Sequence, residues 1–327
     1  MNFCNLVTMC KRKRELNSSK QKHHKCVQPH IFSSSRVVNR VAPDTWQYEI
    51  IPYLDLRQFA NLRCHSSFNM YWHVNMAKNV IRVPQGCPTV EKAMALAVVF
   101  SAKKVYTTAE PLTIRLDKGV HEIVGDEDGL MAVTCSNITF VGKGKDQTTI
   151  RGGFRVENQQ HVKFEELAVM NQSNGTGLYL TGSETNVDVL KCAVKECGGN
   201  GMYVGGGATV TATQCEFMEN GGDGVSCDGA NTKARLNDCK MHHNGEDGLW
   251  ASSAAVVDLH GTKTDIHSNN DYGIRASTRA KVIIHLPSQH NTSHGNVEED
   301  RVQEIGGSIA NINADGTFTH VVVDDGY

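Results

Sequence analysis

Residues 218–227 of the chain read MENGGDGVSC, and the glycine at position 224 in this stretch recurs along the sequence at nearly constant intervals. Five short segments align on such a glycine, with successive intervals of 24, 23, 24 and 25 residues. A repeat of this length that contains short strands predicts a stack of similar coils. The aligned segments are GTGLYL, NGMYVG, DGVSCD, DGLWAS and YGIRAS, which contain Gly177, Gly201, Gly224, Gly248 and Gly273.

The residues that follow each glycine alternate in character. Those one and three positions after it are apolar or small. Since successive side chains of a strand point to opposite faces, these two positions are predicted to face inward and the position between them outward. One unit of about 24 residues cannot bury its own apolar face, but units stacked about 4.8 Å apart can. The sequence therefore predicts a parallel solenoid with inward ladders of like residues.

Two such ladders can be read directly from the alignment. Nine residues before three of the glycines stand cysteines, which we expect to form an inward stack of small hydrophobic side chains without redox chemistry. Four residues before the last three glycines stand asparagines, which we expect to form a ladder that satisfies backbone groups of the turns. The cysteines are Cys192, Cys215 and Cys239; the asparagines are Asn220, Asn244 and Asn269, with Ser173 and Cys197 at the same offset in the earlier coils.

The repeat resembles the right-handed parallel β-helix, or pectin-lyase-like, family. The resemblance runs from Ile81 to Gly316 and includes KGVHEI and ITFVGKGKDQTTIRGG, which are similar to first coils of that fold. Thr89 to Val99 has the pattern of one short amphipathic helix with Thr89 as its N-cap, like the capping helix of such folds. We therefore expect a mainly β protein whose residues 81–327 form a β-helix.

Bulk properties exclude several classes of protein. The chain has 327 residues, a formal net charge of −2 at pH 7 and 39% hydrophobic residues. This charge gives no general attraction to nucleic acid or to anionic membranes, and no apolar run approaches the roughly 20 residues that span a bilayer. The N-terminal stretch lacks a secretory apolar region, so we expect an intracellular protein. The eleven cysteines are then expected to be free thiols.

The β-helix scaffold carries lyases, hydrolases, epimerases, esterases and pure binding modules, so it assigns no reaction by itself. His260-Gly261 is present, as in polygalacturonase-like members, but no Asp-Asp precedes it in the coils and no Arg-X-Lys follows. The Asp-Pro-His-Glu run of alginate epimerases is absent from the sequence. Catalysis is therefore disfavoured; should it occur, Asp223 and Asp247, in register in adjacent coils, are the catalytic candidates.

Metal and cofactor chemistry are also disfavoured. Calcium-binding β-rolls carry Gly-Gly-X-Gly-X-Asp every nine residues, whereas the GGDG of this chain belongs to a longer repeat whose corners carry carboxylates only in some coils. A shared ion ladder would lack oxygen ligands. His242, His243 and His267 are expected in turns, where histidines are more often solvated than catalytic. We expect no metal and no cofactor.

One outward row is a candidate binding surface. The position two residues after the repeat glycines brings aromatic and basic residues into register on one outer face. Tyrosine, tryptophan and arginine are enriched at interface hot spots, although outward stacking between adjacent coils is an equally good explanation. The substrate-binding candidates are Tyr179, Tyr203, Trp250 and Arg275, with Ser226 between them.

The N-terminal quarter differs from the rest. Residues 1–40 carry nine basic residues and one acid, and we expect a disordered basic tail whose KRKR block is a nuclear signal or a solvated segment.

Residues 41–80 have apolar residues at helical spacing. Within them PDTWQYEIIPYLDLRQFANLRCHSSFN resembles the F-box; a helical cap on the solenoid is the alternative. The positions assigned to adaptor contact or the helix core are Pro43, Ile50, Ile51, Leu54, Leu56, Phe59 and Leu62.

The F-box resemblance implies a function. Proteins with this module dock on a Skp-type adaptor within a cullin–RING ubiquitin ligase, and a second domain holds the substrate. The leading hypothesis is therefore the substrate-recognition subunit of an SCF-type ligase, without catalytic residues of its own. The alternatives are a carbohydrate-active enzyme, such as an epimerase or lyase of uronate polymers, and a non-catalytic binding scaffold.

Overall fold

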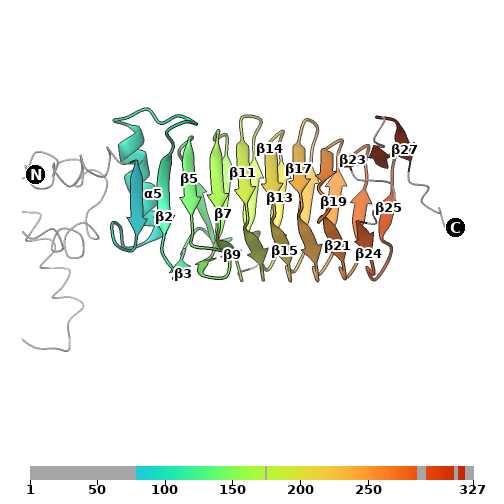
Figure 1. Cartoon of the computed structure of the whole chain (residues 1–327), viewed down its shortest axis with the longest axis horizontal. Coiled ribbons are helices and arrows are strands. Elements are labelled where there is room, and N and C mark those ends of the chain that lie inside the picture. Colours follow the sequence, from blue (N-terminus) through green and yellow to red (C-terminus); the bar gives the residue numbers. More distant parts are fainter. Residues whose placement is uncertain (1–78, 174, 286–291, 313–315, 321–327) are drawn as a thin grey trace, which may run out of the picture.

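The computed structural model describes residues 79–173, 175–285, 292–312 and 316–320. These residues form a stack of coils, each made of up to three short strands, and strands of successive coils lie side by side along the long axis of the molecule (Figure 1). The mainly β, parallel β-helix fold predicted from the repeat is confirmed. The predicted basic tail, the F-box-like module and its seven adaptor-contact positions lie outside the described residues.

Strands of successive coils align into three long sheets, here named A, B and C. Sheet A comprises β1 (Val80–Val83), β2 (Leu112–Leu116), β5 (Ile138–Val141), β8 (Val162–Glu165), β11 (Asn186–Leu190), β14 (Thr209–Thr213), β17 (Lys233–Asn237), β20 (Val256–His260), β23 (Lys281–His285), β26 (Ser308–Ile312) and β27 (Phe318–His320). All its pairings are parallel except that of β26 with β27, which is antiparallel.

Sheets B and C contain eight strands each within the described residues, and their strands pair in parallel. Sheet B comprises β3 (Gly119–Glu122), β6 (Thr148–Arg151), β9 (Ala168–Met170), β12 (Ala193–Lys195), β15 (Glu216–Met218), β18 (Lys240–His242), β21 (Asp265–His267) and β24 (Ser293–His294). Sheet C comprises β4 (Leu130–Val133), β7 (Gly153–Glu157), β10 (Leu178–Thr181), β13 (Met202–Gly205), β16 (Val225–Asp228), β19 (Leu249–Ser252), β22 (Ile274–Ala276) and β25 (Arg301–Gln303).

The helix α5 (Val90–Ser101) packs beside β1 and β2 at the N-terminal end of the described stack (Figure 1). It begins where the sequence predicts, because the Thr89 hydroxyl accepts a hydrogen bond from the Lys92 N–H at 3.3 Å and so satisfies one free donor of the first turn. Its buried face carries Val90, Met94 and Phe100. Nothing helical in the described part of the chain has the length and apolar character to cross a membrane.

The core follows the alternation in the sequence. The residues one and three positions after the repeat glycines are buried in every aligned coil, and the three cysteines of the predicted stack are buried with them. All seven cysteines among the described residues are free thiols, as predicted. Burial raises the pKa of Cys227 to about 12, so this thiol stays protonated and unreactive at neutral pH.

The asparagine ladder is also confirmed, and it is longer than the repeat predicts. The side-chain amide of Asn220 donates to Asn244 Oδ1 at 3.0 Å, and that of Asn244 donates to Asn269 Oδ1 at 2.9 Å. Asn296 continues the ladder by accepting from Asn269 Nδ2 at 2.9 Å. At the other end Asn171, not Ser173, takes the equivalent place, because its amide donates to backbone carbonyls of the turn.

Replacing Asn244 by alanine is expected to lower the free energy of unfolding by about 2 kcal/mol. The side chain of Asn244 also donates to the Phe217 carbonyl at 3.2 Å, so its loss leaves several buried polar groups without partners. Urea unfolding of the variant measures this effect. The control is Asn270→Ala, an exposed asparagine with one 3.3 Å bond to the Gly245 carbonyl; equal losses in the two variants would argue against a stabilising ladder.

Candidate functional site

The outer face of sheet C carries the row of aromatic and basic side chains that the sequence predicts. Strand pairing sets Tyr179 opposite Tyr203 and Trp250 opposite Arg275, with Ser226 opposite both Tyr203 and Trp250. Arg155, which the repeat alignment does not reach, lies opposite Tyr179 and extends the row by one coil. We call Arg155, Tyr179, Tyr203, Trp250 and Arg275 the aromatic strip.

The side chains of the aromatic strip form two groups in contact, one on each side of Ser226. The rings of Tyr179 and Tyr203 stack with their centroids 5.0 Å apart and their planes at 13°. The Arg155 guanidinium lies 5.6 Å from the Tyr179 ring, and that of Arg275 lies 5.8 Å from the Trp250 ring. Both distances are in the cation–π range. All five side chains are partly exposed, so these contacts order the strip without removing it from solvent.

Carboxylates fix the arginine at each end of the strip. Arg155 Nη1 lies 2.8 Å from Asp126 Oδ2, and its Nη2 lies 3.5 Å from Asp128 Oδ2. Arg275 donates to Glu304 Oε2 from Nε at 3.1 Å and from Nη2 at 2.9 Å. Such pairs between exposed groups stabilise the fold little; their effect here is to hold the guanidinium planes beside the aromatic rings.

A row of small and polar residues runs parallel to the strip, two positions further along each strand. Gly205 lies in this row, and its lack of a side chain leaves room for the ring of Tyr203. A Cβ at position 205 would lie 2.8 Å from the Cε1 and hydroxyl oxygen of Tyr203, so the glycine lets that ring lie over its own strand. Apart from this glycine, the row borders the strip with hydroxyl groups and carboxylates. The row consists of Glu157, Thr181, Gly205, Asp228 and Ser252.

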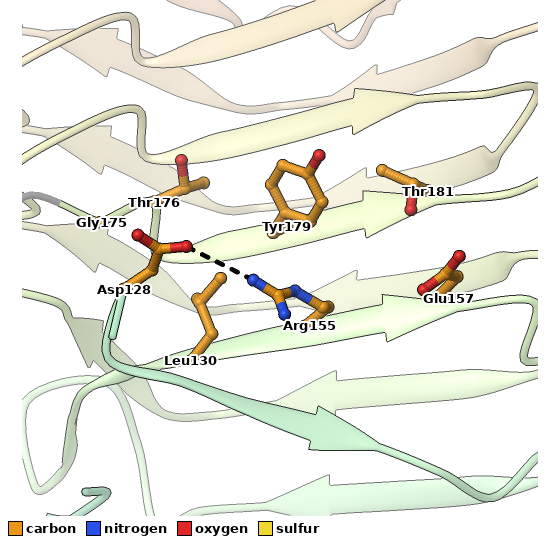
Figure 2. Close-up of a pocket in the computed structure, with 8 residues that line it drawn as sticks. All are labelled: Asp128, Leu130, Arg155, Glu157, Gly175, Thr176, Tyr179 and Thr181. Atoms are coloured by element: carbon orange, nitrogen blue, oxygen red, sulfur yellow. Dashed lines mark hydrogen bonds and ion pairs between the residues drawn. The ribbon is translucent and has the colours of Figure 1, made fainter. Parts of the chain in front are cut away.

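The strip has a shallow pocket of about 460 Å³ at its Arg155 end. Figure 2 shows the Tyr179 ring between Thr176 and Thr181, with Arg155 reaching toward Asp128 below it. Gly175 lets its own turn lie against the turn of Asp128, because a Cβ at position 175 would lie 2.1 Å from the Asp128 carbonyl oxygen. The pocket thus offers one aromatic face together with hydroxyls, carboxylates and a guanidinium. Its lining residues are Asp128, Leu130, Arg155, Glu157, Gly175, Thr176, Tyr179 and Thr181.

Asp223 and Asp247 lie in the turns that precede sheet C, only 1% and 2% exposed. Asp223 Oδ1 accepts from the Asp247 N–H at 3.2 Å, and Asp247 Oδ1 accepts from the Tyr272 N–H at 3.0 Å. Burial raises the pKa of Asp223 to about 7, with a further contribution from the Asp247 charge, and burial raises the pKa of Asp247 to about 6. Both Oδ1 atoms thus accept from turn backbone, while Asp247 Oδ2 lies 3.9 Å from Arg275 Nη1.

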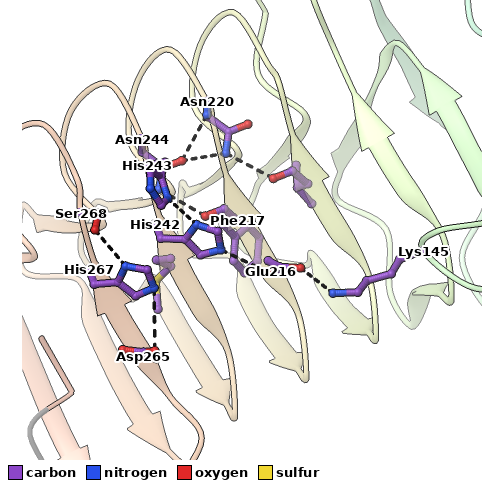
Figure 3. A network of polar contacts seen from close by, with 12 residues as sticks. Lys145, Glu216, Phe217, Asn220, His242, His243, Asn244, Asp265, His267 and Ser268 are labelled. Carbon is purple, nitrogen blue, oxygen red and sulfur yellow. Dashed lines mark hydrogen bonds and ion pairs between the residues drawn. The ribbon is translucent and has the colours of Figure 1, made fainter.

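Two of the three histidines expected in turns lie at the ends of strands instead. His242 ends β18 and His267 ends β21, and both lie on the outer face of sheet B, while His243 directly follows β18. The rings of His242 and His267 stack with their centroids 5.0 Å apart and their planes at 1°. His242 Nε2 lies 3.1 Å from Glu216 Oε1, and Lys145 pairs with Oε2 of the same carboxylate (Figure 3). The parallel register of sheet B explains this stack, because it brings side chains from successive coils into line.

Comparison with known proteins gives a match to the family described as "Right handed beta helix region" over residues 123–296. No curated protein matches the chain in sequence. Three solved structures illustrate its structural neighbours. ORF18 of Geobacillus virus E2 is 12% identical with a TM-score of 0.45, and the match covers 77% of this chain but only 64% of that one.

Two further neighbours have similar scores. Pectin methylesterase PemA from Erwinia chrysanthemi is 14% identical, with a TM-score of 0.42 over 73% of this chain and 84% of its own. The A-module of the mannuronan C-5 epimerase AlgE4 of Azotobacter vinelandii is 12% identical, with a TM-score of 0.41 over 70% of this chain and 81% of its own. The family match spans more than half of the sequence, and this protein therefore belongs to the right-handed β-helix family.

Proposed function

We propose that this protein binds an extended carbohydrate chain along the aromatic strip. The observation that carries the proposal is the pairing of two parallel rows on sheet C, one aromatic and basic, the other hydroxyl and carboxylate. Sugar rings present apolar C–H faces and polar edges. Aromatic faces are negative at their centres and attract such C–H groups, while the second row supplies hydrogen-bond partners for hydroxyls.

The dimensions of the strip favour a chain over a globular partner. Arg155 and Arg275 are five coils apart, so the strip is about 24 Å long. It is one side chain wide and bordered by polar residues, whereas a stable protein interface buries about 800 Å² per partner around an apolar centre. The rigid strand pairing also presets the rings, so little ordering entropy opposes binding.

The proposal assigns binding and no reaction. Asp223 and Asp247, the carboxylates named from the sequence as catalytic candidates, are buried and bonded to turn backbone, so a bound chain has no direct access to them. The arginines at the ends of the strip are already paired with carboxylates. Neutral sugar hydroxyls suit the acids of the second row, whereas uronate carboxylates would compete with Asp126 and Glu304 for the two arginines.

Affinity co-sedimentation of the full chain with insoluble or immobilised polysaccharides tests the proposal. One arm uses neutral glucans, galactans and mannans; the other uses polygalacturonate and alginate, each with and without calcium. We expect saturable binding in one arm. In the same samples, release of reducing ends, methanol or unsaturated uronate measures the enzymatic alternative. Failure to bind any of these polymers, or turnover of one of them, would overturn a purely binding role.

Gly205 provides a test of how the strip is positioned. In Gly205→Ala the new methyl group must displace the Tyr203 ring, which is the movable partner in that contact. We expect carbohydrate affinity to fall roughly fivefold with the melting temperature nearly unchanged. Thr209→Ala, on the exposed face of sheet A, is the matched control. Unchanged affinity in Gly205→Ala would show that the Tyr203 ring takes no part in binding.

A second candidate function rests on the sequence of residues 43–69, whose order of apolar residues is similar to the F-box. The protein would then be the substrate receptor of an SCF-type ubiquitin ligase, acting in the cytoplasm or nucleus, with the β-helix holding a modified or glycosylated substrate. Co-precipitation of a purified Skp-type adaptor with the full chain, lost in Leu54→Asp, is the expected result. No adaptor binding by the intact protein would exclude this function and leave the carbohydrate proposal untouched.

A further inference from the structure

The outer face of sheet A carries a cluster of side chains that the aromatic strip does not use. Asp258 and His260 lie on β20, and His285 lies on β23, directly opposite His260. The two imidazole rings stack with their centroids 4.0 Å apart and their planes at 11°. His285 Nε2 lies 2.6 Å from Asp258 Oδ1.

His260 is the unusual member of this cluster. Its Nε2 is fully shielded from solvent and has no hydrogen-bond partner among the described residues. A buried polar nitrogen without a partner costs free energy, so its position calls for a ligand that the polypeptide does not provide. One donor atom each from Asp258, His260 and His285 lies within 4.8 Å of the other two, and no other group of three such donors in the described part of the chain meets this spacing.

We propose that Asp258, His260 and His285 bind one divalent transition-metal ion, with zinc as the best fit. Two imidazole nitrogens and one carboxylate oxygen form a donor set that suits zinc, cobalt or nickel better than calcium or magnesium. The sequence-based expectation of no metal overlooked this set. His260 lies two residues after Asp258, and His285 lies 25 residues after His260. This spacing indicates no metal site until parallel pairing places β20 beside β23.

Metal binding requires the three side chains to rearrange. Ligand atoms of a tetrahedral zinc lie about 2.0–2.2 Å from the metal, hence roughly 3.3–3.5 Å from one another. The His260 and His285 rings are stacked nearly parallel, so at least one of them must rotate out of the stack for both lone pairs to point at one metal. The partial exposure of all three residues leaves room for that rotation. The metal would replace the close contact between His285 and Asp258 and accept the lone pair of His260 Nε2, with the ring proton on Nδ1. A fourth position would be left for water or another ligand.

Charged neighbours bear on the affinity of this site. Arg235, directly opposite Asp258 on β17, is the nearest base in the same outward row, and its positive charge acts on His260. The positive charge of Arg235 repels a metal cation and so weakens its binding. Its side chain is exposed, however, so solvent screens most of that repulsion. We therefore expect metal binding to strengthen only slightly in Arg235→Ala.

Metal titration of the full chain tests the proposal. Cobalt(II) is used as the spectroscopic probe and zinc(II) in calorimetry, with wild type compared against His260→Ala/His285→Ala. Wild type is expected to bind one equivalent more than the double variant and to show visible d–d bands that excess zinc removes. Asp258→Asn, which keeps the size of the side chain, is expected to weaken binding at least tenfold.

The control variant is His242→Ala/His267→Ala, which removes the other stacked histidine pair, on sheet B. It is expected to retain the full stoichiometry and the cobalt spectrum. Melting curves of all variants without metal establish that each is folded. Equal stoichiometry in wild type and His260→Ala/His285→Ala, or loss of the cobalt bands in His242→Ala/His267→Ala instead, would overturn the assignment.

Discussion

Replacing Asp223 by asparagine is expected to remove a large part of the dependence of stability on pH between about 4 and 8. In the folded protein, burial first and the neighbouring Asp247 second raise the pKa of Asp223 from its usual 3.8 to about 7. A carboxyl whose pKa is higher in the folded state binds more protons there than in the unfolded chain. It therefore favours folding fully below pH 4, and this contribution is lost as the pH rises through 7.

The size of the effect follows from the shift. About three pKa units correspond to roughly 4 kcal/mol at most, and relaxation of the site reduces this to an order of 2–4 kcal/mol. Urea unfolding at intervals from pH 4 to 8 measures it. Between pH 4 and 8 the free energy of unfolding of wild type is expected to fall by that amount more than the free energy of unfolding of Asp223→Asn. Asn at this position still accepts the Asp247 N–H bond through its carbonyl oxygen.

Asp188→Asn is the matched control, because Asp188 is an exposed aspartate on β11. This variant should follow the wild-type dependence on pH. If Asp223→Asn retained the wild-type slope, the pKa of Asp223 in the folded protein would have to lie near its usual 3.8. A channel from solvent to its Oδ2, which has no hydrogen-bond partner among the described residues, would then have to exist.

The double variant Tyr203→Ala/Trp250→Ala is expected to weaken carbohydrate binding on the order of 100-fold. Each ring supplies a large apolar contact whose truncation costs about 1.5 kcal/mol, and two such losses give about 3 kcal/mol. Both side chains stand on the outer face of sheet C, so the fold should be preserved. Equilibrium binding to the polymer selected in the panel measures the loss, and melting curves confirm folding.

His242→Ala/His267→Ala serves as the control for this variant as well, since it removes two stacked rings from a different sheet of the same solenoid. Its affinity should equal that of wild type. A comparable loss in both double variants would show that the measured binding is a diffuse property of the solenoid surface, and would exclude the strip as a specific site.

Much of this fold was predictable because its repeat is regular where the sheets are regular. The glycine alignment places Leu178, Met202 and Val225 in the core and Tyr179 and Tyr203 on the outside, and the structure confirms both assignments. Strand alternation is a local property, so once the register of one coil is known its neighbours follow.

The ladder position was predicted wrongly in the coil whose turn has a different length. The turn after β9 differs from later turns, so counting back from the glycine gives Ser173 where Asn171 takes the ladder position. Arg155 was missed for a different reason: the alignment started at Gly177, although Gly153 stands 24 residues earlier and Arg155 two positions after it. Burial of Asp223 and Asp247 was not predicted, because a turn pattern does not say whether a carboxylate faces backbone or solvent.

The histidine clusters show a different limit. Their members are far apart in sequence and come together only through stacking of strands in sheets A and B. His242 and His267 were assigned to turns because the strands of sheet B are only two to four residues long and carry little periodic signal. Short strands of this kind are recognised by their pairing and not by their composition.

Hydroxyl-radical footprinting of the protein, free and saturated with its polysaccharide, tests the central claim most directly. The method reports the solvent exposure of individual aromatic and histidine side chains. Binding along the aromatic strip predicts that oxidation of Tyr179, Tyr203 and Trp250 falls severalfold on saturation, while that of His242 and His267 stays constant. Protection of the histidines with unchanged oxidation of the strip would contradict the account.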